Sequence, residues 1–302
     1  MKKSISTLLL LVLVAIGANA QLLYKVTGKN LKDPSYIVGT YHLAPASFAD
    51  SIPGMAKALN EVGQVYGELD MADMTIPANI QKMQAAMMLP EGQSLTTLLT
   101  AEQQTRLNGL LNSMMGADLT NPMMASQLGK LTPSALATQL TMLLYMQKHA
   151  DTFDPNNLID GYFQREAKAK NKIVGGLENI DFQIKVLYQS AEMPRQIEQL
   201  MCFVDHQDFQ IRISDQIMKA YFSQNIDQIK DAMDEKTNDS CDTTPEEQDR
   251  LIYGRNADWA KKMPTIMETA GTLFVVGAAH LPGEKGVLHL LKAAGYTVEG
   301  VK

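Results

Sequence analysis

Apolar residues cluster at the two ends of this 302-residue chain in the patterns that β-strands require. Residues 22–28 alternate apolar and polar side chains, and residues 35–40 form a β-branched, apolar run after a Lys-Asp-Pro turn. A third strand is predicted at 64–70. Near the C-terminus, strands are predicted at 272–277 and 296–301. The first two strands read as a hairpin, because only a short turn separates them.

Residues 51–62 carry a helical pattern between the strands at 35–40 and 64–70. Ser51 is the candidate N-cap of this helix. Four apolar residues fall on one of its faces, namely Met55, Ala58, Leu59 and Val62. Strand–helix–strand order predicts adjacent parallel strands. The C-terminal strands are likewise separated by a predicted helix, near 283–294, and form a second unit of the same kind.

The middle of the chain, about 74–235, reads as a long helical insertion rich in Met, Leu, Gln and Ala. Pro and Gly break it into several helices, and Thr100 opens one of them with a capping box. A short strand is predicted inside it, at 172–178. The methionines suit a soft ligand groove or ordinary core filling, and their helical spacing favours core filling. The predicted fold class is therefore α/β (α+β), with two βα-rich arms that join one central sheet around a helical insertion.

Residues 1–20 have the layout of a secretory signal peptide. Two lysines precede an apolar run from Leu8 to Ile16, and small residues end the segment at Ala20. The run is short for a membrane span, which needs about 20 residues, although an uncleaved anchor is the alternative. We therefore expect an exported protein, periplasmic or secreted, whose single domain comprises 21–302 and does not span the membrane after cleavage.

Charge and cysteine content narrow the functional classes. The formal net charge is −6 at pH 7, which argues against a nucleic-acid partner, since phosphate binding requires a basic face. The two cysteines, Cys202 and Cys241, favour one disulfide in an exported protein, and two free buried thiols are the alternative. Their spacing matches neither a metal-binding nor a redox-active pair.

The same short motif follows a predicted strand near each end of the chain. It reads IVGTYHL at 37–43 and VVGAAHL at 275–281, and each copy contains Gly-x-x-His. A glycine at a strand end allows a sharp turn and a close approach of the backbone to a ligand. Ligand sites of open α/β sheets lie beyond the carboxyl ends of their strands. If the two strands are neighbours, His42 and His280 converge there.

Glu68 lies at the end of the strand predicted at 64–70 and should project toward the same edge. Two imidazoles and one carboxylate leave open positions on a divalent metal, which can activate water. A histidine after a strand is often only a hydrogen-bonded structural residue, but the doubled motif favours the metal site. The remaining histidines, His149, His206 and His289, have no matching partner motif.

Four segments of the chain resemble the TraB/PrgY/GumN family, which is related to the Tiki metalloproteases. They read SYIVGTYHL, VYGELDM, GRNADWAKKM and LFVVGAAHLPGEKGVLHLLKAAGYTVEGV. The segment LIDGYFQREAKAKNKIVGGLENIDFQI also fits the family's central region. The resemblance spans about residues 22–301 and implies a Tiki-like fold with metal-dependent peptide hydrolysis.

The resemblance also implies roles for individual residues. It points to His42, Glu68 and His280 at the metal, with Gly39 and Gly277 in the paired motifs, and with Arg255 and Asn256 in support. It favours manganese or cobalt over a closed zinc site. Glu68 is either a metal ligand or the general base for the metal's water.

Three charged residues have two interpretations each. A fixed Arg255 guanidinium would stabilise negative charge on a carbonyl oxygen under attack, or it would simply pair with a buried carboxylate such as Glu68 or Glu178. Glu178 and Asp160 would each orient a ligand histidine or cap a helix.

The leading interpretation is an exported metal-dependent hydrolase that cleaves a peptide or protein substrate. The alternatives are an envelope protein of the same fold that binds a peptide or a haem-like ligand without turnover, or a degenerate member kept for envelope integrity. The oligomeric state is not predicted.

Overall fold

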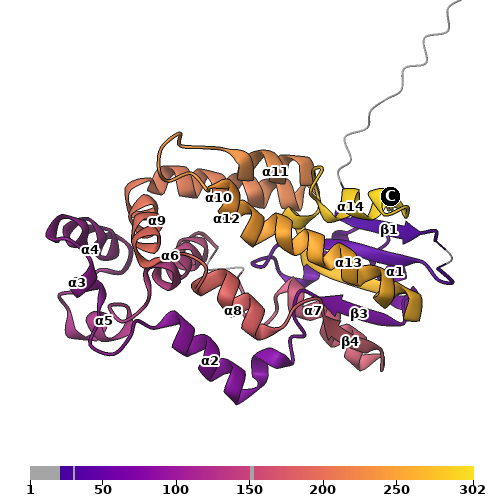
Figure 1. The fold of residues 1–302 in the computed structure, drawn as a ribbon, viewed down its shortest axis with the longest axis horizontal. Coiled ribbons are helices and arrows are strands. Elements are labelled where there is room, and N and C mark those ends of the chain that lie inside the picture. Colours follow the sequence, from indigo (N-terminus) through magenta and orange to yellow (C-terminus); the bar gives the residue numbers. More distant parts are fainter. Residues whose placement is uncertain (1–20, 30, 150–152) are drawn as a thin grey trace, which may run out of the picture.

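The computed structural model describes residues 21–29, 31–149 and 153–302, so the predicted signal peptide at 1–20 lies outside the described residues (Figure 1). The described residues form one six-stranded sheet with the order β4-β3-β5-β2-β1-β6. Its strands are β1 (Leu23–Thr27), β2 (Ser35–Thr40), β3 (Gln64–Gly67), β4 (Ile173–Gly176), β5 (Thr272–Gly277) and β6 (Thr297–Gly300). Both arms of the chain thus join one sheet, and the mixed α/β fold class is confirmed.

The centre of the sheet is the parallel pair β2 and β5. All six residues of each strand are buried, because helices or loops cover both faces of these apolar runs. The hairpin prediction is confirmed, since β1 pairs antiparallel with β2. β1 also pairs antiparallel with β6, which is the outermost strand on that side of the sheet.

The predicted adjacency of β2 and β3 is wrong. The two strands are parallel, but β5 lies between them and pairs with both. β5 is apolar on both faces, so a position in the middle of the sheet buries most of its surface. The strand–helix–strand pattern of residues 35–70 is local and cannot show that a strand from the far end of the chain inserts between β2 and β3. Similarly, β6 pairs with β1 and not with β5.

Most of the remaining described chain is helical. The α-helices are α1 (Met55–Glu61), α2 (Pro77–Met87), α3 (Leu95–Leu98), α4 (Ala101–Met115), α5 (Pro122–Gln127), α6 (Pro133–Lys148), α7 (Ile159–Ala169), α8 (Ile180–Tyr188), α9 (Met193–Asp205), α10 (Gln207–Phe222), α11 (Ile226–Asp234), α12 (Pro245–Gln248), α13 (Gly254–Thr269) and α14 (Val287–Ala293). Short 3-10 helices lie at Ala46–Ser51, Asp73–Thr75 and Ala278–His280, and a π-helical turn at Asp249–Tyr253 joins α12 to α13.

One predicted helix start is confirmed and another is wrong. Thr100 accepts a hydrogen bond from the backbone N–H of Gln103, whose side chain accepts in return, so the capping box of α4 is present. α1 begins at Met55, later than predicted. Ser51 is therefore not the N-cap of α1 but the last residue of the preceding 3-10 helix. Gly54 precedes α1 with φ +74°, a left-handed conformation that lets the chain turn before the helix starts.

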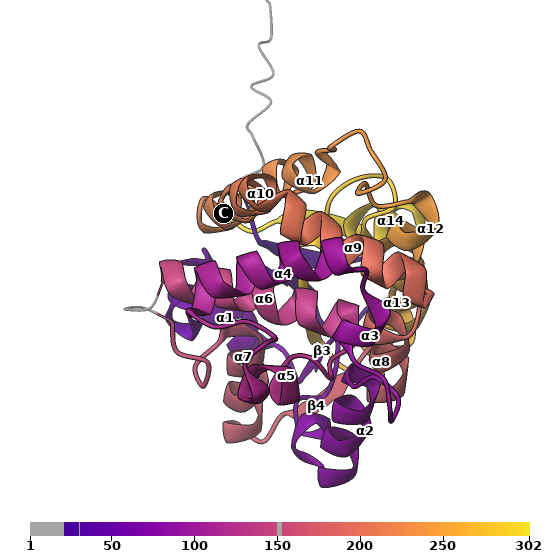
Figure 2. The same cartoon turned by 90° about the vertical axis from the view of Figure 1, so that its left-hand side faces the viewer.

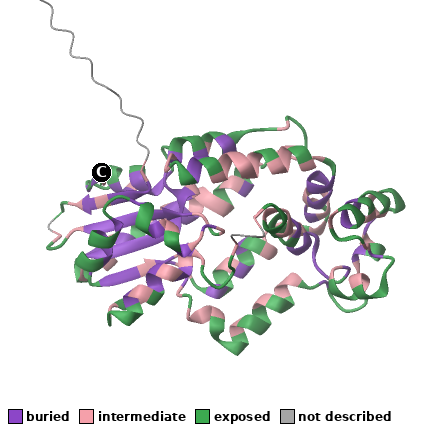
Figure 3. Ribbon diagram, turned by 180° about the vertical axis from the view of Figure 1, so that it is seen from behind, coloured by how far each residue is buried: buried purple, intermediate pink, exposed green. Residues whose placement is uncertain are grey.

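The helical insertion forms a lobe of its own beside the sheet (Figures 1 and 2). The lobe has a separate apolar core, built mainly from α4, α6 and α9. Its fully buried leucines are Leu95, Leu107, Leu111, Leu136, Leu140 and Leu200. The insertion is not purely helical, because it contains β4, which joins the sheet beside β3. Its helix α7 lies outside the lobe and packs on β3, β4 and β5. Purple buried positions in Figure 3 concentrate on the sheet and inside this lobe. No helix among the described residues is long and apolar enough to cross a membrane.

The expectation that methionines fill the core does not hold for the segment 74–146. Met87 and Met114 only border the lobe's core, whereas Met123 is 63 % exposed. Met142 and Met146 are also exposed. Leucines at the neighbouring helical positions occupy the buried face, and the methionines lie on its margin.

Candidate active site

The ends of three neighbouring parallel strands place the predicted site residues at one edge of the sheet. In the β2–β5 pair Thr40 lies opposite Gly277, and in the β3–β5 pair Gly67 lies opposite Val275. His42 follows β2 by two residues, Glu68 directly follows β3, and His280 ends the 3-10 turn after β5. The structure therefore brings the two Gly-x-x-His motifs and Glu68 together.

Gly277 lies where the three side chains meet. A Cβ atom at Gly277 would lie 3.3 Å from Glu68 Oε1, 3.4 Å from His280 Cδ2 and 4.0 Å from His42 Nε2. Gly39 has a different task, because a Cβ there would lie 2.8 Å from Leu281 and 3.0 Å from the backbone of the turn that carries His280. Both motif glycines thus permit close packing: Gly39 between its strand and the turn that carries His280, and Gly277 beneath the site.

His42 is held through its Nδ1 atom. That atom lies 2.8 Å from Asp160 Oδ2, while Thr40 Oγ1 donates to the other carboxylate oxygen at 2.5 Å. The charge of Asp160 raises the pKa of His42 to about 9. The side chain is 68 % exposed, so the imidazole lies at the mouth of the site. Asp160 on α7 therefore orients a histidine, as one of its two interpretations expected.

His280 is held in the same way but in buried surroundings. Its Nδ1 lies 2.6 Å from Asn256 Oδ1, and Asn256 Nδ2 donates to the carbonyl of Lys285. This arrangement makes Nδ1 the protonated nitrogen, so that Nε2 keeps its lone pair and accepts a hydrogen bond from Arg255 Nη1 at 3.3 Å. Burial lowers the pKa of His280 to about 4, and the ring stays neutral at pH 7.

Arg255 links two carboxylates beneath the histidines. Its Nη2 donates to Glu68 at 2.6 Å, and its Nε and Nη2 donate to the two oxygens of Glu178 at 2.8 and 2.9 Å. The indole N–H of Trp259 donates to Glu178 at 2.9 Å, and its ring lies 4.8 Å from the guanidinium and packs on His280. Glu178 therefore fixes Arg255, and it forms no hydrogen bond or ion pair with His42 or His280.

Glu68 is kept ionised at this edge. Its Oε1 accepts from the Gly277 backbone N–H at 2.8 Å, and its Oε2 accepts from Arg255. Burial works to raise the pKa of Glu68, but its electrostatic interactions with His280, Arg255 and His42 outweigh burial and lower that pKa to about 2. Because Arg255 is charged at every accessible pH, it is the lasting cause of this shift.

The imidazole nitrogens of His42 and His280 and the carboxylate of Glu68 are donor types that bind divalent cations. Part of their spacing also suits one shared ion. Both motif histidines are anchored through Nδ1 by an oxygen, the usual arrangement of histidines that bind metals through Nε2. His280 Nε2 lies 4.0 Å from Glu68 Oε1. Among the described residues, however, His206, Asp239 and Cys241 are the only group of three ligands whose atoms all lie within 4.8 Å of one another. His42, Glu68 and His280 would therefore have to draw closer together to share one ion.

A pocket of about 190 Å³ opens beside Glu68 and His42. Leu69, Met71 and Met74 form its apolar side. Ligand sites for drug-sized molecules measure roughly 300–1,000 Å³, so this smaller pocket suits a single side chain.

Two supporting residues escaped the sequence reasoning. Gln164 on α7 is buried and clamps the loop after Glu68, because its Nε2 donates to Leu69 O at 2.7 Å and its Oε1 accepts from Met71 N at 2.8 Å. Thr40 holds Asp160. Gln164 lies one helical turn after Asp160 on the same face of α7, and this spacing was the signal that could have identified it.

Comparisons of the sequence with known proteins identify a family. The sequence pattern of the TraB/PrgY/gumN family matches residues 22–300. Metalloprotease TIKI2 of Danio rerio is 23 % identical over 88 % of this chain and 58 % of its own length. The Metalloprotease TIKI homolog of Nematostella vectensis is 24 % identical over 89 % of this chain and 65 % of its own length. Metalloprotease TIKI1 of Homo sapiens is 25 % identical over 88 % of this chain and 59 % of its own length.

This chain thus spans about three-fifths of the length of these curated relatives. No solved structure matches it significantly. The family pattern covers nearly all of the described residues, including both Gly-x-x-His motifs and the Arg255 helix. The chain is therefore a member of the TraB/PrgY/gumN family.

Proposed function

We propose that this protein is a metal-dependent hydrolase of peptide bonds. The observation that carries the proposal is the convergence on Gly277 of two imidazoles, from opposite ends of the chain, with one ionised carboxylate. The names of the relatives, metalloproteases at 23–25 % identity, support the same reaction class. The signal-like pattern of residues 1–20 supports export to the periplasm or the exterior.

His42, His280 and Glu68 would hold the metal. Nitrogen and oxygen ligands suit several divalent metals, and the family resemblance favours manganese or cobalt over zinc. When bound, such an ion supplies Lewis-acid polarisation of a carbonyl and lowers the pKa of bound water. Asp160 and Asn256 would fix the two rings so that each presents its Nε2 atom to the ion.

The protein's own groups would provide the remaining catalysis. Glu68 stays ionised near neutral pH, so it can accept a proton from the attacking water if it does not bind the metal. Arg255 would stabilise the negative charge that develops on the carbonyl oxygen. Glu178 and Trp259 hold the guanidinium in place, so the positive charge needs no rearrangement during the reaction.

The pocket beside the site would receive one side chain of the peptide. Leu69, Met71 and Met74 provide an apolar wall for it, and methionine adapts readily to different shapes.

Hydrolysis of a peptide library, followed by mass spectrometry, tests the proposal. We expect cleavage with Mn²⁺ or Co²⁺, loss of cleavage with EDTA, and recovery on metal addition. His42→Ala should abolish cleavage, while His289→Ala, at an exposed position on α14, should retain it. Tight peptide binding without turnover would overturn the hydrolase and favour a binding protein. Cleavage that survives both EDTA and His42→Ala would overturn the proposed site.

A further inference from the structure

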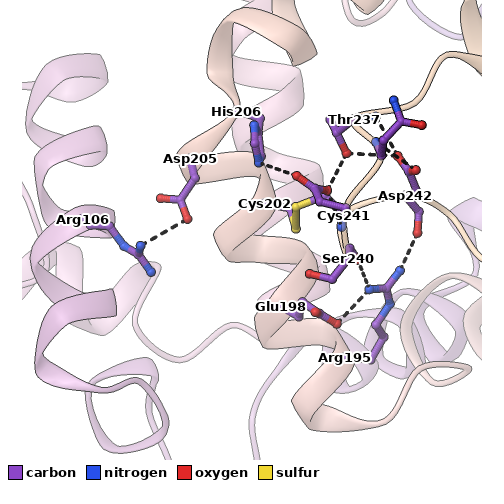
Figure 4. Close-up of a disulfide and its surroundings, with 12 residues drawn as sticks. Arg106, Arg195, Glu198, Cys202, Asp205, His206, Thr237, Ser240, Cys241 and Asp242 are labelled. Carbon is purple, nitrogen blue, oxygen red and sulfur yellow. Dashed lines mark hydrogen bonds and ion pairs between the residues drawn. A yellow bond between two sulfur atoms is a disulfide. The ribbon is translucent and has the colours of Figure 1, made fainter.

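A second cluster of metal-type ligands lies about the disulfide in the helical lobe (Figure 4). The disulfide joins Cys202, on the last turns of α9, to Cys241, in the loop 235–244 that connects α11 to α12. His206 follows Cys202 by four residues and therefore lies on the same side of the chain. One ligand atom each from His206, Asp239 and Cys241 lies within 4.8 Å of the other two.

The loop carrying Cys241 is held in place by more than the disulfide. Arg195 on α9 donates to the carbonyls of Ser240 at 2.5 Å and Asp242 at 2.9 Å, on either side of Cys241. Arg195 is itself held by the buried Glu247 through two hydrogen bonds. These contacts would keep Cys241 beside α9 after the sulfur–sulfur bond is broken.

The loop also holds Asp239 in position. Its Oδ1 accepts from the backbone N–H of Cys241 at 2.8 Å, while its Oδ2 faces His206 Nε2 at 3.5 Å. Zinc bonds to sulfur, nitrogen and oxygen measure roughly 2.0–2.3 Å, so donors around a tetrahedral ion lie about 3.3–3.8 Å apart. The His206–Asp239 pair already has this separation.

We propose that the reduced form of this protein binds one Zn²⁺ through Cys202, Cys241, His206 and Asp239. Two sulfurs, one imidazole and one carboxylate are a donor set that zinc prefers. The site is separate from the candidate active site, which contains no cysteine. The link between α9 and the loop 235–244 would thereby exist in two forms, a disulfide when oxidised and a metal bridge when reduced.

The exchange needs a reductant, and a dithiol supplies it. The dithiol gives two electrons and two protons to the disulfide, so that Cys202 and Cys241 become thiols and the dithiol becomes a cyclic disulfide. Zn²⁺ then displaces one proton from each thiol and binds the two thiolates. His206 and Asp239 have side chains 36 % and 43 % exposed, so both the reductant and the ion have access from solvent.

Cobalt titration of the reduced full chain tests the proposal. The disulfide is reduced with a phosphine, two thiols per chain are counted, and retention of the fold is checked by circular dichroism. Co²⁺ bound to thiolate gives a near-ultraviolet charge-transfer band, which the cysteine-free candidate active site cannot produce. We expect this band at one Co²⁺ per chain in the reduced protein, its absence in the oxidised protein, and its displacement by Zn²⁺.

Two variants decide which residues form the site. Removing an outer partner of a ligand already weakens metal binding roughly 10–100-fold, so His206→Ala should weaken Zn²⁺ binding by at least roughly tenfold. Cys241→Ser should abolish the band, and His289→Ala should leave it unchanged. The proposal is overturned if the reduced, folded protein shows no band, if His206→Ala has no effect, or if reduction alone unfolds the chain.

Discussion

Arg255 Nη2 lies 2.6 Å from Glu68 Oε2 while the same guanidinium holds both oxygens of Glu178. The three side chains come from segments that follow β3, follow β4 and begin α13, so one buried charge cluster joins three parts of the fold. Its net charge is negative, and its side chains are at most 14 % exposed. A cluster of this kind suits a cationic ligand above it and costs stability when one partner is removed.

Glu178→Gln should destabilise the protein strongly. The variant weakens the charge-assisted hydrogen bonds from Arg255 to Glu178, which contribute about 1.5–3 kcal/mol each, while Glu68 still compensates the guanidinium. Glu178 has a side chain only 1 % exposed, so we expect a loss of about 3 kcal/mol in urea unfolding. Asp181→Asn is the matched control, since Asp181 pairs with Lys82 at the surface and should contribute no more than about 1 kcal/mol. Equal losses for the two variants would contradict the structural role given to Glu178.

Gly277→Ala should weaken metal binding more than it weakens the fold. The added methyl group would press on Glu68 Oε1 at 3.3 Å and His280 Cδ2 at 3.4 Å. We expect Mn²⁺ affinity, measured by calorimetry, to fall roughly tenfold, with a stability loss of about 1–2 kcal/mol. Gly109→Ala in α4 meets no atom within 4 Å and should raise stability by about 0.5–1 kcal/mol without changing metal affinity. Unchanged affinity in Gly277→Ala would place the ion elsewhere.

Asn256→Ala should release the ring of His280. Loss of such an orienting partner typically lowers metal affinity roughly 10–100-fold. Asn256→Asp should restore part of the affinity, because a carboxylate oxygen also accepts the Nδ1 proton, whereas a purely structural role would predict no such recovery. Asn60→Ala is the control, because Asn60 is exposed and its side chain accepts a hydrogen bond from Lys170. Calorimetric titration of the four proteins makes the comparison.

Acid should weaken the anchoring of the loop 235–244 through Glu247. The hydrogen bonds from Arg195 lower the pKa of Glu247 below its ordinary 4.5 in the folded protein. A group with a lowered folded pKa stabilises the protein above its unfolded pKa, and this contribution is lost as the pH falls below about 4.5. Glu247→Gln should therefore show a smaller loss of stability between pH 6 and pH 3 than the parent protein.

Glu198→Gln is the matched control for that pH dependence. Glu198 binds the same Arg195, but its side chain is 41 % exposed, against 6 % for Glu247. We expect Glu198→Gln to change both the stability at pH 6 and its acid dependence much less. Parallel stability–pH curves for Glu247→Gln and the parent protein would show that the Arg195–Glu247 pair does not respond to pH.

Local sequence patterns predicted the strands and their ends well. The runs at β2 and β5 are mostly apolar and buried at every position, and the glycine in each motif marks the close approach that Gly39 and Gly277 make. The position of His42, His280 and Glu68 at one edge follows from parallel strands, because such strands end on the same side.

Long-range choices could not be predicted in this way. Nothing in residues 35–70 indicates that β5 enters between β2 and β3. Arg255 binds both Glu68 and Glu178 only because β4 pairs with β3 at the sheet edge. Short sequence motifs do not indicate this pairing. The exposure of His42 also could not be predicted from the sequence. His280 ends the same Gly-x-x-His motif, yet it is buried while His42 is exposed.

The stoichiometry of bound metal tests the central claim most directly. Elemental analysis of the oxidised chain, after loading with Mn²⁺ and desalting, should give one equivalent for the parent protein and for His289→Ala. It should give none for His42→Ala and none for His280→Ala, because each removes one of three ligands. A full equivalent retained by both histidine variants, or no metal in the parent protein, would contradict the account.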